Sequence, residues 1–581
     1  MPGGPRLWSA GTVTQLAAGT ATVRPSSRRR WGALAVLCVT MLVISLDMTI
    51  LNIALPALVR SLKATESQLQ WIVDVYSCIF AGFLLVLGSV GDRVGRKKVF
   101  CVGLAVFAVG SAGSAFSTSV TTLIAARAVM GLGAACIMPA TLSIITDLFR
   151  EPQLQARAIG IWSGTTGLGI AIGPIAGGWL LSHYWWGSVF LINVPFTVAG
   201  LFTALWLVPD SKDPAPRRTD WVGAALSVTG LALLLWAIIE VPVKGWRSDL
   251  VFAAGAAAVV VLAAFVLWER RSSHPLLLIE PFANRRFSVA MASVALAVFA
   301  LMGCLFVLTQ YLQFSLGYSA FATGLRILPI AGVLGVAAVS SIYFDRVLGT
   351  KVVVAVGLIV VAVGLWQLTT TTTSVGFSHT LLGMVLLGFG SGFIISPATA
   401  SVMDSLPRER SGVGSATNSS SLQVGGALGV AVIGAVLSSR YQGDIAPLLA
   451  GHSVPLVAKN AILGSIGGAL AVAHAAGGSM GAALATQARH AFVAGMDLSL
   501  RVGAVVVAVS MVLVAAALPS RRVDAGSLLP PVDQGTDGGG PLEPLEAAGP
   551  VAVHGLPGAD GGPDRPVASE GVGPVGKVPL D

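Results

Sequence analysis

Charged side chains are scarce in this chain of 581 residues. Asp, Glu, Lys and Arg together make up 11% of it, whereas hydrophobic residues make up 54%. A soluble domain carries about 25% charged residues, so this sequence cannot cover a water-exposed surface. The shortage excludes a secreted disulfide scaffold, a disordered protein and a nucleic-acid-binding protein as descriptions of the whole chain. The net charge of +9 is spread over short loops and bears on membrane topology instead.

Residues that build metal and nucleotide sites are also few. The five cysteines lie inside apolar stretches without a C-x-x-C pair, and the seven histidines lie in loops, at span edges or near the C-terminus. We therefore expect no disulfide and no metal site. No G-x-x-x-x-G-K-[ST] motif occurs, so ATP is not the expected energy source. A membrane-embedded enzyme or sensor stays an alternative, although it would need a soluble domain or a cluster of His, Asp and Glu within the spans.

Long apolar runs take up most of the chain. A helix needs about 20 apolar residues to cross a bilayer, and fourteen such runs lie between residues 33 and 518. With the N-terminus inside, 26 of the 36 Lys and Arg residues fall in cytoplasmic segments and seven in outer loops. This bias predicts an all-α integral membrane protein with both termini in the cytoplasm.

The spans divide into segments with different expected structures. Residues 31–210 and 271–520 are predicted to form two six-helix bundles, with two linker transmembrane helices at 211–270 between them. The long outer loop 439–490 is Ala/Gly-rich and is expected near the membrane surface. We expect a polar cytoplasmic arm at 1–30, whose arginines meet anionic lipids, and a disordered cytoplasmic tail at 521–581.

Two passages recur in the chain. GLGAACIMPATLS begins at Gly131, and GFGSGFIISPATAS begins at Gly388; DRVGRK begins at Asp92, and DRVLGTK begins at Asp345. The members of each pair lie eight spans apart and keep the same orientation. Two parallel six-helix halves around a site at mid-membrane are a transporter architecture.

Three ionisable residues lie at membrane depth. At 1.5 Å per residue, Asp47 lies about 13 Å from the outer end of its span, Arg127 about 9 Å and Asp74 about 6 Å. A buried carboxyl group beside an arginine pairs with it when ionised and releases it when protonated. We therefore predict that all three residues take part in proton coupling; the alternative is a static ion pair that joins two helices.

The loop of residues 88–98, GSVGDRVGRKK, contains more than basic residues. Its positive charge is expected for a cytoplasmic turn, but Asp92 and the glycines are not explained by charge alone. We predict a cytoplasmic gate in which Arg96 joins Asp92 to Asp147, at the inner end of the fourth span. Arg93 and Gly95 complete this predicted gate, and the glycine permits a tight turn.

The fifth span contains GIAIGPIAGG at residues 169–178. Gly169, Gly173 and Gly177 are spaced to form a flat helix face for close packing, and Gly178 follows directly. Pro174 removes one backbone hydrogen bond. We expect this segment to act as a hinge and seal.

These passages together resemble the major facilitator superfamily, specifically its 14-helix drug:proton antiporters (the EmrB/QacA group). The first span, residues 46–56 (LDMTILNIALP), is similar to the L-D-x-T-x-x-N-x-A-x-P signature of this group. Residues 88–98 resemble the cytoplasmic gate motif, residues 123–135 the span-4 motif with Met130 in place of the usual Gln, and residues 190–195 (FLINVP) the opening of span 6. Residues 169–178 match the antiporter motif G-x-x-x-G-P-x-x-G-G at every fixed position.

The resemblance implies a secondary active exporter that works by alternating access. Its energy source would be the proton gradient, without a cofactor, and Asp47 and Arg127 would carry the coupling proton. The substrate would be a small amphiphilic, lipophilic or monocationic molecule. Some family members that handle divalent cations have an additional acid within span 10, whereas this span has Arg326 and no acid before Asp345 at its inner end. The protein is expected to act as a monomer in the bacterial cytoplasmic membrane. A dedicated exporter of one metabolite or self-made antibiotic remains the competing interpretation.

Overall fold

The computed structural model describes residues 27–212, 219–245, 247–277, 279–373, 376–406, 411–450 and 453–517. The predicted arm at 1–30, except for its last four residues, and the predicted tail at 521–581 lie outside these ranges. Every regular element in them is helical. Fourteen helical segments are long and apolar enough to cross a membrane, which confirms the predicted number of spans.

The N-terminal half contains the first seven helices, and a pair of helices follows it. The bounds of the half are α1 (Ser27–Leu62), α2 (Glu66–Val94), α3 (Arg96–Ala115), α4 (Val120–Leu148), α5 (Pro152–His183), α6 (Ser188–Leu191) and α7 (Asn193–Leu207). Next come α8 (Trp221–Lys244) and α9 (Asp249–Arg271), which pack on each other; α8 also lies against α2 and α14.

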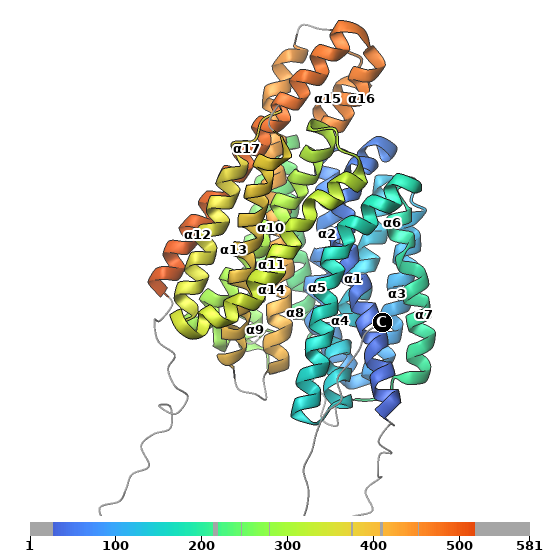
Figure 1. Cartoon of the computed structure of the whole chain (residues 1–581), viewed down its shortest axis with the longest axis vertical. Coiled ribbons are helices and arrows are strands. Elements are labelled where there is room, and N and C mark those ends of the chain that lie inside the picture. Colours follow the sequence, from blue (N-terminus) through green and yellow to red (C-terminus); the bar gives the residue numbers. More distant parts are fainter. Residues whose placement is uncertain are drawn as a thin grey trace, which may run out of the picture. The chain divides into compact units, whose positions relative to one another are not determined.

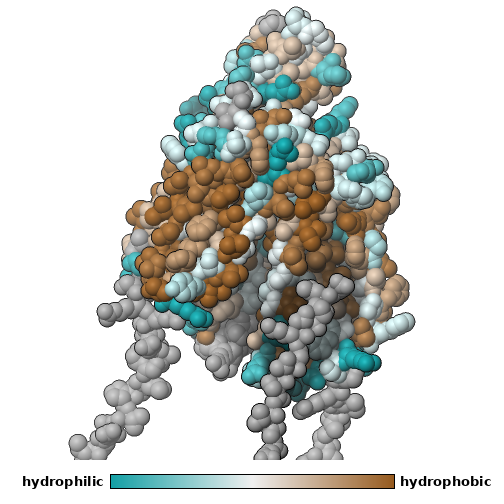
Figure 2. Space-filling model, viewed as in Figure 1, coloured by the Kyte–Doolittle hydropathy of each residue, from teal (hydrophilic) through white to brown (hydrophobic). Residues whose placement is uncertain are grey.

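The C-terminal half begins after the short helix η1 (Glu280–Ala283). Its elements are α10 (Arg285–Gln310), the π-helical turn η2 (Tyr311–Ser315), α11 (Ala320–Leu348), α12 (Thr350–Leu368), α13 (Phe377–Asp404), α14 (Ser411–Leu449), α15 (Leu456–Gly464), α16 (Ile466–Ala476) and α17 (Gly478–Ala517). Figure 1 shows the long helices running between two ends of the bundle. We call these the α16 end and the Arg96 end. Figure 2 shows hydrophobic side chains gathered between them.

The predicted outer loop 439–490 is mostly helical. Helix α14 continues to Leu449, α17 starts at Gly478, and α15 and α16 lie between them. Alanine has the highest intrinsic helix propensity, and the Ser465 side chain caps α16 by accepting a hydrogen bond from the Gly468 N–H at 3.1 Å. The segment 439–490, which was predicted to be a loop, therefore extends α14 and α17 and forms two short helices between them.

The repeated passages occupy corresponding places in the two halves. Gly131 of α4 faces the Tyr76 backbone of α2, and Gly388 of α13 faces the Ile330 backbone of α11. Gly95 and Gly349, which end α2 and α11, have φ angles of +126° and +81°, a region that favours glycine. The sequence repeat is thus also a repeat of backbone structure.

Helices α5 and α11 of the two halves meet tightly toward the α16 end. A Cβ atom added to Gly178 would lie 2.6 Å from Phe321 Cα and 2.7 Å from the Ala320 carbonyl oxygen, and Gly324 presses equally closely on the Pro174 carbonyl group. Toward the Arg96 end, by contrast, a Cβ at Gly164 of α5 or at the α11 glycines 332 and 335 would meet no atom within 4 Å. Helices α5 and α11 are therefore in contact at the α16 end and apart at the Arg96 end, which we call the closed end and the open end of the bundle.

Candidate functional site

The most enclosed charged pair in the described ranges joins α1 to α4. Arg127 Nη1 donates to Asp47 Oδ2 at 2.6 Å, and the two side chains are 2% and 0% exposed. The other carboxylate oxygen, Oδ1, accepts a 3.0 Å hydrogen bond from Asn193 Nδ2 of α7. Asn193 Nδ2 also donates to Ser111 Oγ of α3 at 3.2 Å. Both oxygens of Asp47 are thus satisfied inside an apolar bundle, as a buried carboxylate requires.

The arginine is held by groups besides the carboxylate. Arg127 Nε donates to the Ile72 carbonyl oxygen at 3.2 Å, and its guanidinium carbon lies 4.4 Å from the centre of the Tyr76 ring. Met130, which stands where the group's motif has Gln, places its sulfur 3.9 Å from Arg127 Nη1. A weak sulfur contact therefore replaces the amide at this position.

Asp74 does not join this pair. It is fully buried, and neither of its carboxyl oxygens has a hydrogen-bond partner within the described residues. Residues two apart on a helix point about 200° apart. Since Ile72 and Tyr76 contact Arg127, Asp74 faces the other way. One turn earlier, Gln70 is equally buried and unpartnered, and it abuts Gly434 of α14.

The predicted gate residues form a cluster at the other end of α2. Arg96 Nε donates to Asp92 Oδ1 at 2.8 Å, and its Nη1 forms a short ion pair with Asp147 of α4. Arg93 is exposed and lies outside this cluster. All three bonded residues belong to the N-terminal half, and their bonds are intact although this end of the bundle is open. The cluster therefore joins α2, α3 and α4 to one another, and its role as a cytoplasmic gate stays a prediction.

The glycines of α5 pack on α1. An added Cβ at Gly169 would lie 2.6 Å from the Leu42 carbonyl oxygen; at Gly173, 3.0 Å from that of Leu46; and at Gly177, 2.6 Å from Ile50 Cγ1. Each glycine thus admits the α1 backbone or side chains at a distance that a larger residue would not allow. Gly178 is different, because it faces α11 of the opposite half.

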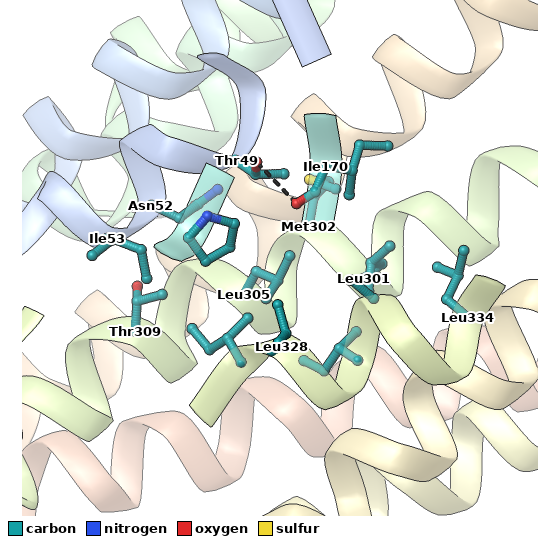
Figure 3. A pocket seen from close by; sticks show the side chains of 14 residues that line it. Thr49, Asn52, Ile53, Ile170, Leu301, Met302, Leu305, Thr309, Leu328 and Leu334 are labelled. Atoms are coloured by element: carbon teal, nitrogen blue, oxygen red, sulfur yellow. Dashed lines mark hydrogen bonds between the residues drawn. The ribbon is translucent and has the colours of Figure 1, made fainter. Parts of the chain in front are cut away.

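The backbone bond that Pro174 removes is replaced by a side chain. Proline has no N–H to offer the carbonyl group four residues earlier, and here that carbonyl belongs to Ile170. Thr49 Oγ1 of α1 donates to the Ile170 carbonyl oxygen at 3.3 Å, as the dashed line in Figure 3 shows. The proline position is therefore tied to α1, and the role of this segment as a hinge and seal stays a prediction.

A small cavity lies where α1, α5, α10 and α11 meet (Figure 3). Its volume of about 30 Å³ is far below the 300–1,000 Å³ typical of ligand pockets. The lining is mainly aliphatic, with Thr49, Asn52 and Thr309 as its polar members. An apolar wall with few polar groups suits an amphiphilic molecule, which would need the halves to move apart before it could enter.

Sequence reasoning missed two features of this region. Asn193 was noted only within the FLINVP passage, although a lone amide in an apolar span is itself a signal of a buried polar partner. The C-terminal half also has its own glycine crossing: Gly425 and Gly429 of α14 press on the Ala295 and Phe299 carbonyl groups of α10. Their four-residue spacing is that of Gly169 and Gly173, so it could have been found by extending the repeat.

Residues 37–430 match the Major Facilitator Superfamily. This chain belongs to the major facilitator superfamily. It is therefore a multi-pass membrane protein of a transporter family and not an enzyme. The predicted resemblance is confirmed, and so is the all-helical fold of this superfamily.

Several curated proteins of the superfamily resemble the chain over most of its length. The multidrug efflux pump LfrA of Mycolicibacterium smegmatis is 34% identical over 86% of this chain and 97% of its own length. A tetracenomycin C resistance and export protein of Streptomyces glaucescens is 34% identical over 88% and 96%. The methyl viologen resistance protein SmvA of Salmonella typhimurium is 30% identical over 80% and 93%.

A solved structure of another transporter has the same fold. It is a bacterial homologue of the human lysosomal transporter Spinster in an inward-facing conformation, with a TM-score of 0.61 and 18% identity over 85% of this chain and 98% of the homologue. At this identity the likeness shows the fold alone.

The glycine face of α5 gives a first prediction. Gly173→Leu should lose efflux while the protein still folds, because overpacking costs about 1–3 kcal/mol where the new side chain meets the Thr49 hydroxyl and the Leu46 carbonyl oxygen of α1. Gly164→Leu on the same helix is the matched control, since the new Cβ would have no atom within 4 Å. Transport by purified protein in vesicles measures the effect. Equal rates for both variants and wild type would remove close packing from the account of this motif.

Proposed function

We propose that this chain exports small amphiphilic, lipophilic or monocationic drugs or antibiotics across the bacterial cytoplasmic membrane in exchange for protons. The observation that carries the proposal is the buried Asp47–Arg127 pair on α1, the helix that also lines the aliphatic cavity between the halves. The names of two relatives support drugs or antibiotics as substrates, multidrug efflux and tetracenomycin C export, whereas methyl viologen, in the name of a third relative, is a dication.

We place the Arg96 end of the bundle in the cytoplasm. The support is the distribution of Lys and Arg residues: the two termini and the segments at that end contain 26 of them, and the loops at the opposite end contain seven. By the positive-inside rule, the side with more Lys and Arg is cytoplasmic. Both termini are then cytoplasmic, and the described conformation opens inward. Residues 31–210 and 271–520 form the two moving halves, 211–270 supplies the linker helices, and the working unit is a monomer.

Proton coupling rests on competition for Arg127. An ionised Asp47 holds the guanidinium group, and a protonated Asp47 gives up the ionic part of that bond. Asn193 can hydrogen-bond either form, so the site keeps its geometry while its charge changes. Asp74, buried on the opposite face of α2, is a separate protonatable group toward α14. The Asp92, Arg96 and Asp147 cluster, with Gly95 at its turn, keeps the inner ends of α2–α4 together during the motion.

The C-terminal half has a positively charged side chain, that of Arg326. The Arg326 guanidinium carbon of α11 lies 3.9 Å from the centre of the Tyr318 ring and 5.3 Å from that of Phe377. Among the described residues it forms no ion pair. A positive charge in this half would repel dications, and on this basis we propose neutral and monocationic substrates.

A dedicated antibiotic exporter is the second candidate function. The specific observation in its favour is the 34% identity to the tetracenomycin C resistance and export protein. A drug-susceptibility panel in an efflux-deficient host separates the two candidates, because a multidrug pump raises resistance to several unrelated compounds and a dedicated one to a single class. A protonophore should abolish the resistance in either case. Resistance that persists at full strength with the protonophore would contradict proton exchange.

A further inference from the structure

One buried acid has no part in the mechanism above. Glu66, the first residue of α2, is 3% exposed and lies at the α16 end. Its Oε1 accepts a 2.8 Å hydrogen bond from Gln310 Nε2 at the last position of α10. Because α2 and α10 belong to different halves, this bond joins the halves at their closed end.

A second bond and a helical cover accompany it. Gln313 Nε2 of η2 donates to the Ile53 carbonyl oxygen of α1 at 3.0 Å, again between the halves. Above them, a Cβ at Gly467 of α16 would lie 2.7 Å from the Phe314 ring of the C-terminal half and would also press on Val59 of the N-terminal half. Glu66 is thus shielded from water while this end is closed, and separation of the halves would break its bond and hydrate it.

The charged neighbours of Glu66 are occupied elsewhere. At the α16 end, Arg60 lies over the Phe314 ring at 5.9 Å, and Arg489 Nε of α17 donates to the Phe314 carbonyl oxygen at 3.2 Å. The charged pairs of the two other helices beside α2 lie within each helix: Glu240 with Lys244 on α8, and Arg440 with Asp444 on α14. The Tyr441 hydroxyl of α14 donates to the Ile462 carbonyl oxygen. Within the described ranges, Glu66 forms no ion pair.

The amide partner favours a protonated carboxyl group. Gln310 Oε1 is buried without a hydrogen-bond partner, which costs free energy. A protonated Glu66 can donate its O–H to that oxygen while its other oxygen still accepts from Gln310 Nε2. An ionised Glu66 has only acceptors and would leave Gln310 Oε1 unsatisfied. The closed end therefore suits the acid form, and an open, hydrated end suits the carboxylate.

We propose that Glu66 is a second proton-binding residue, whose protonation latches the α16 end shut through Gln310. The proposal rests on the proposed orientation, which places this end outside the cell. A proton from external water forms an O–H bond with the Glu66 carboxylate as the halves close, and the bond breaks to the same side when they reopen. Glu66 thus gates the cycle in response to external acidity without carrying a proton across, a task that belongs to Asp47.

The test measures the opening of the α16 end directly. Spin labels at Ser61→Cys of α1 and Thr370→Cys beyond α12, both exposed positions, report the distance between the halves in nanodiscs. All proteins carry Asp47→Asn, so that Asp47 contributes no pH dependence. With Glu66 intact, lowering the pH from about 8 to about 5.5 should shift the distances toward the short, closed population. The protonated fraction of Glu66 increases as the pH falls toward the ordinary pKa of a glutamate. With Glu66→Gln, the closed population should dominate at both values.

Two further variants protect the interpretation. Gln310→Leu keeps the acid and removes its partner, so it should reduce the closed population at low pH, and it replaces Glu66→Gln if that variant fails to fold. Glu240→Gln, a partly buried acid of α8, should respond like the parent. An undiminished pH response in both Glu66→Gln and Gln310→Leu would overturn the latch. The distances require no substrate, so a failure of drug export would leave this result readable.

Discussion

Replacing Asp47 by asparagine should abolish proton-coupled efflux while the protein remains folded and inserted. Asparagine keeps the size of the side chain and one oxygen that accepts from Arg127, but it cannot bind or release a proton. The variant therefore holds position 47 in a single, uncharged state beside Arg127. Asp47→Ala should be less stable still, because it also leaves Arg127 Nη1 and Asn193 Nδ2 without a hydrogen-bond acceptor at this position.

Drug efflux from proteoliposomes under an imposed pH gradient measures the effect. We expect transport by Asp47→Asn to fall to the level of empty vesicles and to lose its pH dependence. Asp497→Asn is the matched control: Asp497 also pairs with an arginine, Arg501 at 2.8 Å, but one turn along the same helix and at a partly exposed site. Uphill transport by Asp47→Asn at wild-type rates would remove this carboxyl group from the mechanism.

Gly178→Ala should trap the bundle away from the conformation described here. The added methyl group would meet Phe321 Cα and the Ala320 carbonyl group, which are backbone atoms and cannot rotate aside. At an overpacking cost of about 1–3 kcal/mol, the equilibrium should shift about 5- to 150-fold toward the form open at the α16 end. Efflux should fall because that end no longer closes.

The Ser61 and Thr370 label pair reports this shift as a longer distance. Gly164→Ala lies on the same helix with no atom within 4 Å of the new Cβ, so it should leave both the distance and the transport rate unchanged. A closed distance distribution in Gly178→Ala would show that the contact between α5 and α11 yields to a methyl group, and the seal would then have to lie elsewhere.

The depth of the charged residues in the membrane was predictable from the sequence, but the face of the helix on which each residue lies was not taken into account. Counting residues from the span ends put Asp47 and Arg127 at similar depths, and they do form a pair. The same count grouped Asp74 with them, although its helical phase turns it away from Arg127. Phase is readable from the sequence only once one contact of the helix is known, and here that contact is Tyr76.

Partners from distant segments were beyond sequence reasoning. Nothing in the passage around Ser111 indicates that its hydroxyl lies beside Asn193, because the contact depends on how α3 and α7 pack. The same holds for Glu66 and Gln310, which are 244 positions apart. The motifs of α5 were predictable as a packing face, whereas the bond from Thr49 to Ile170 required the register of α1 against α5.

The contact between Pro174 and Gly324 divides α5 into unequal arms. From Pro152 to Pro174 there are 22 residues and from Pro174 to His183 only nine, which correspond to lengths of about 33 Å and about 14 Å. If α5 turns about this contact as one rigid rod with α1, its Arg96 end moves more than twice as far as its α16 end. The transporter would then admit substrate through a wide mouth on one side and discharge it through a narrow slit on the other.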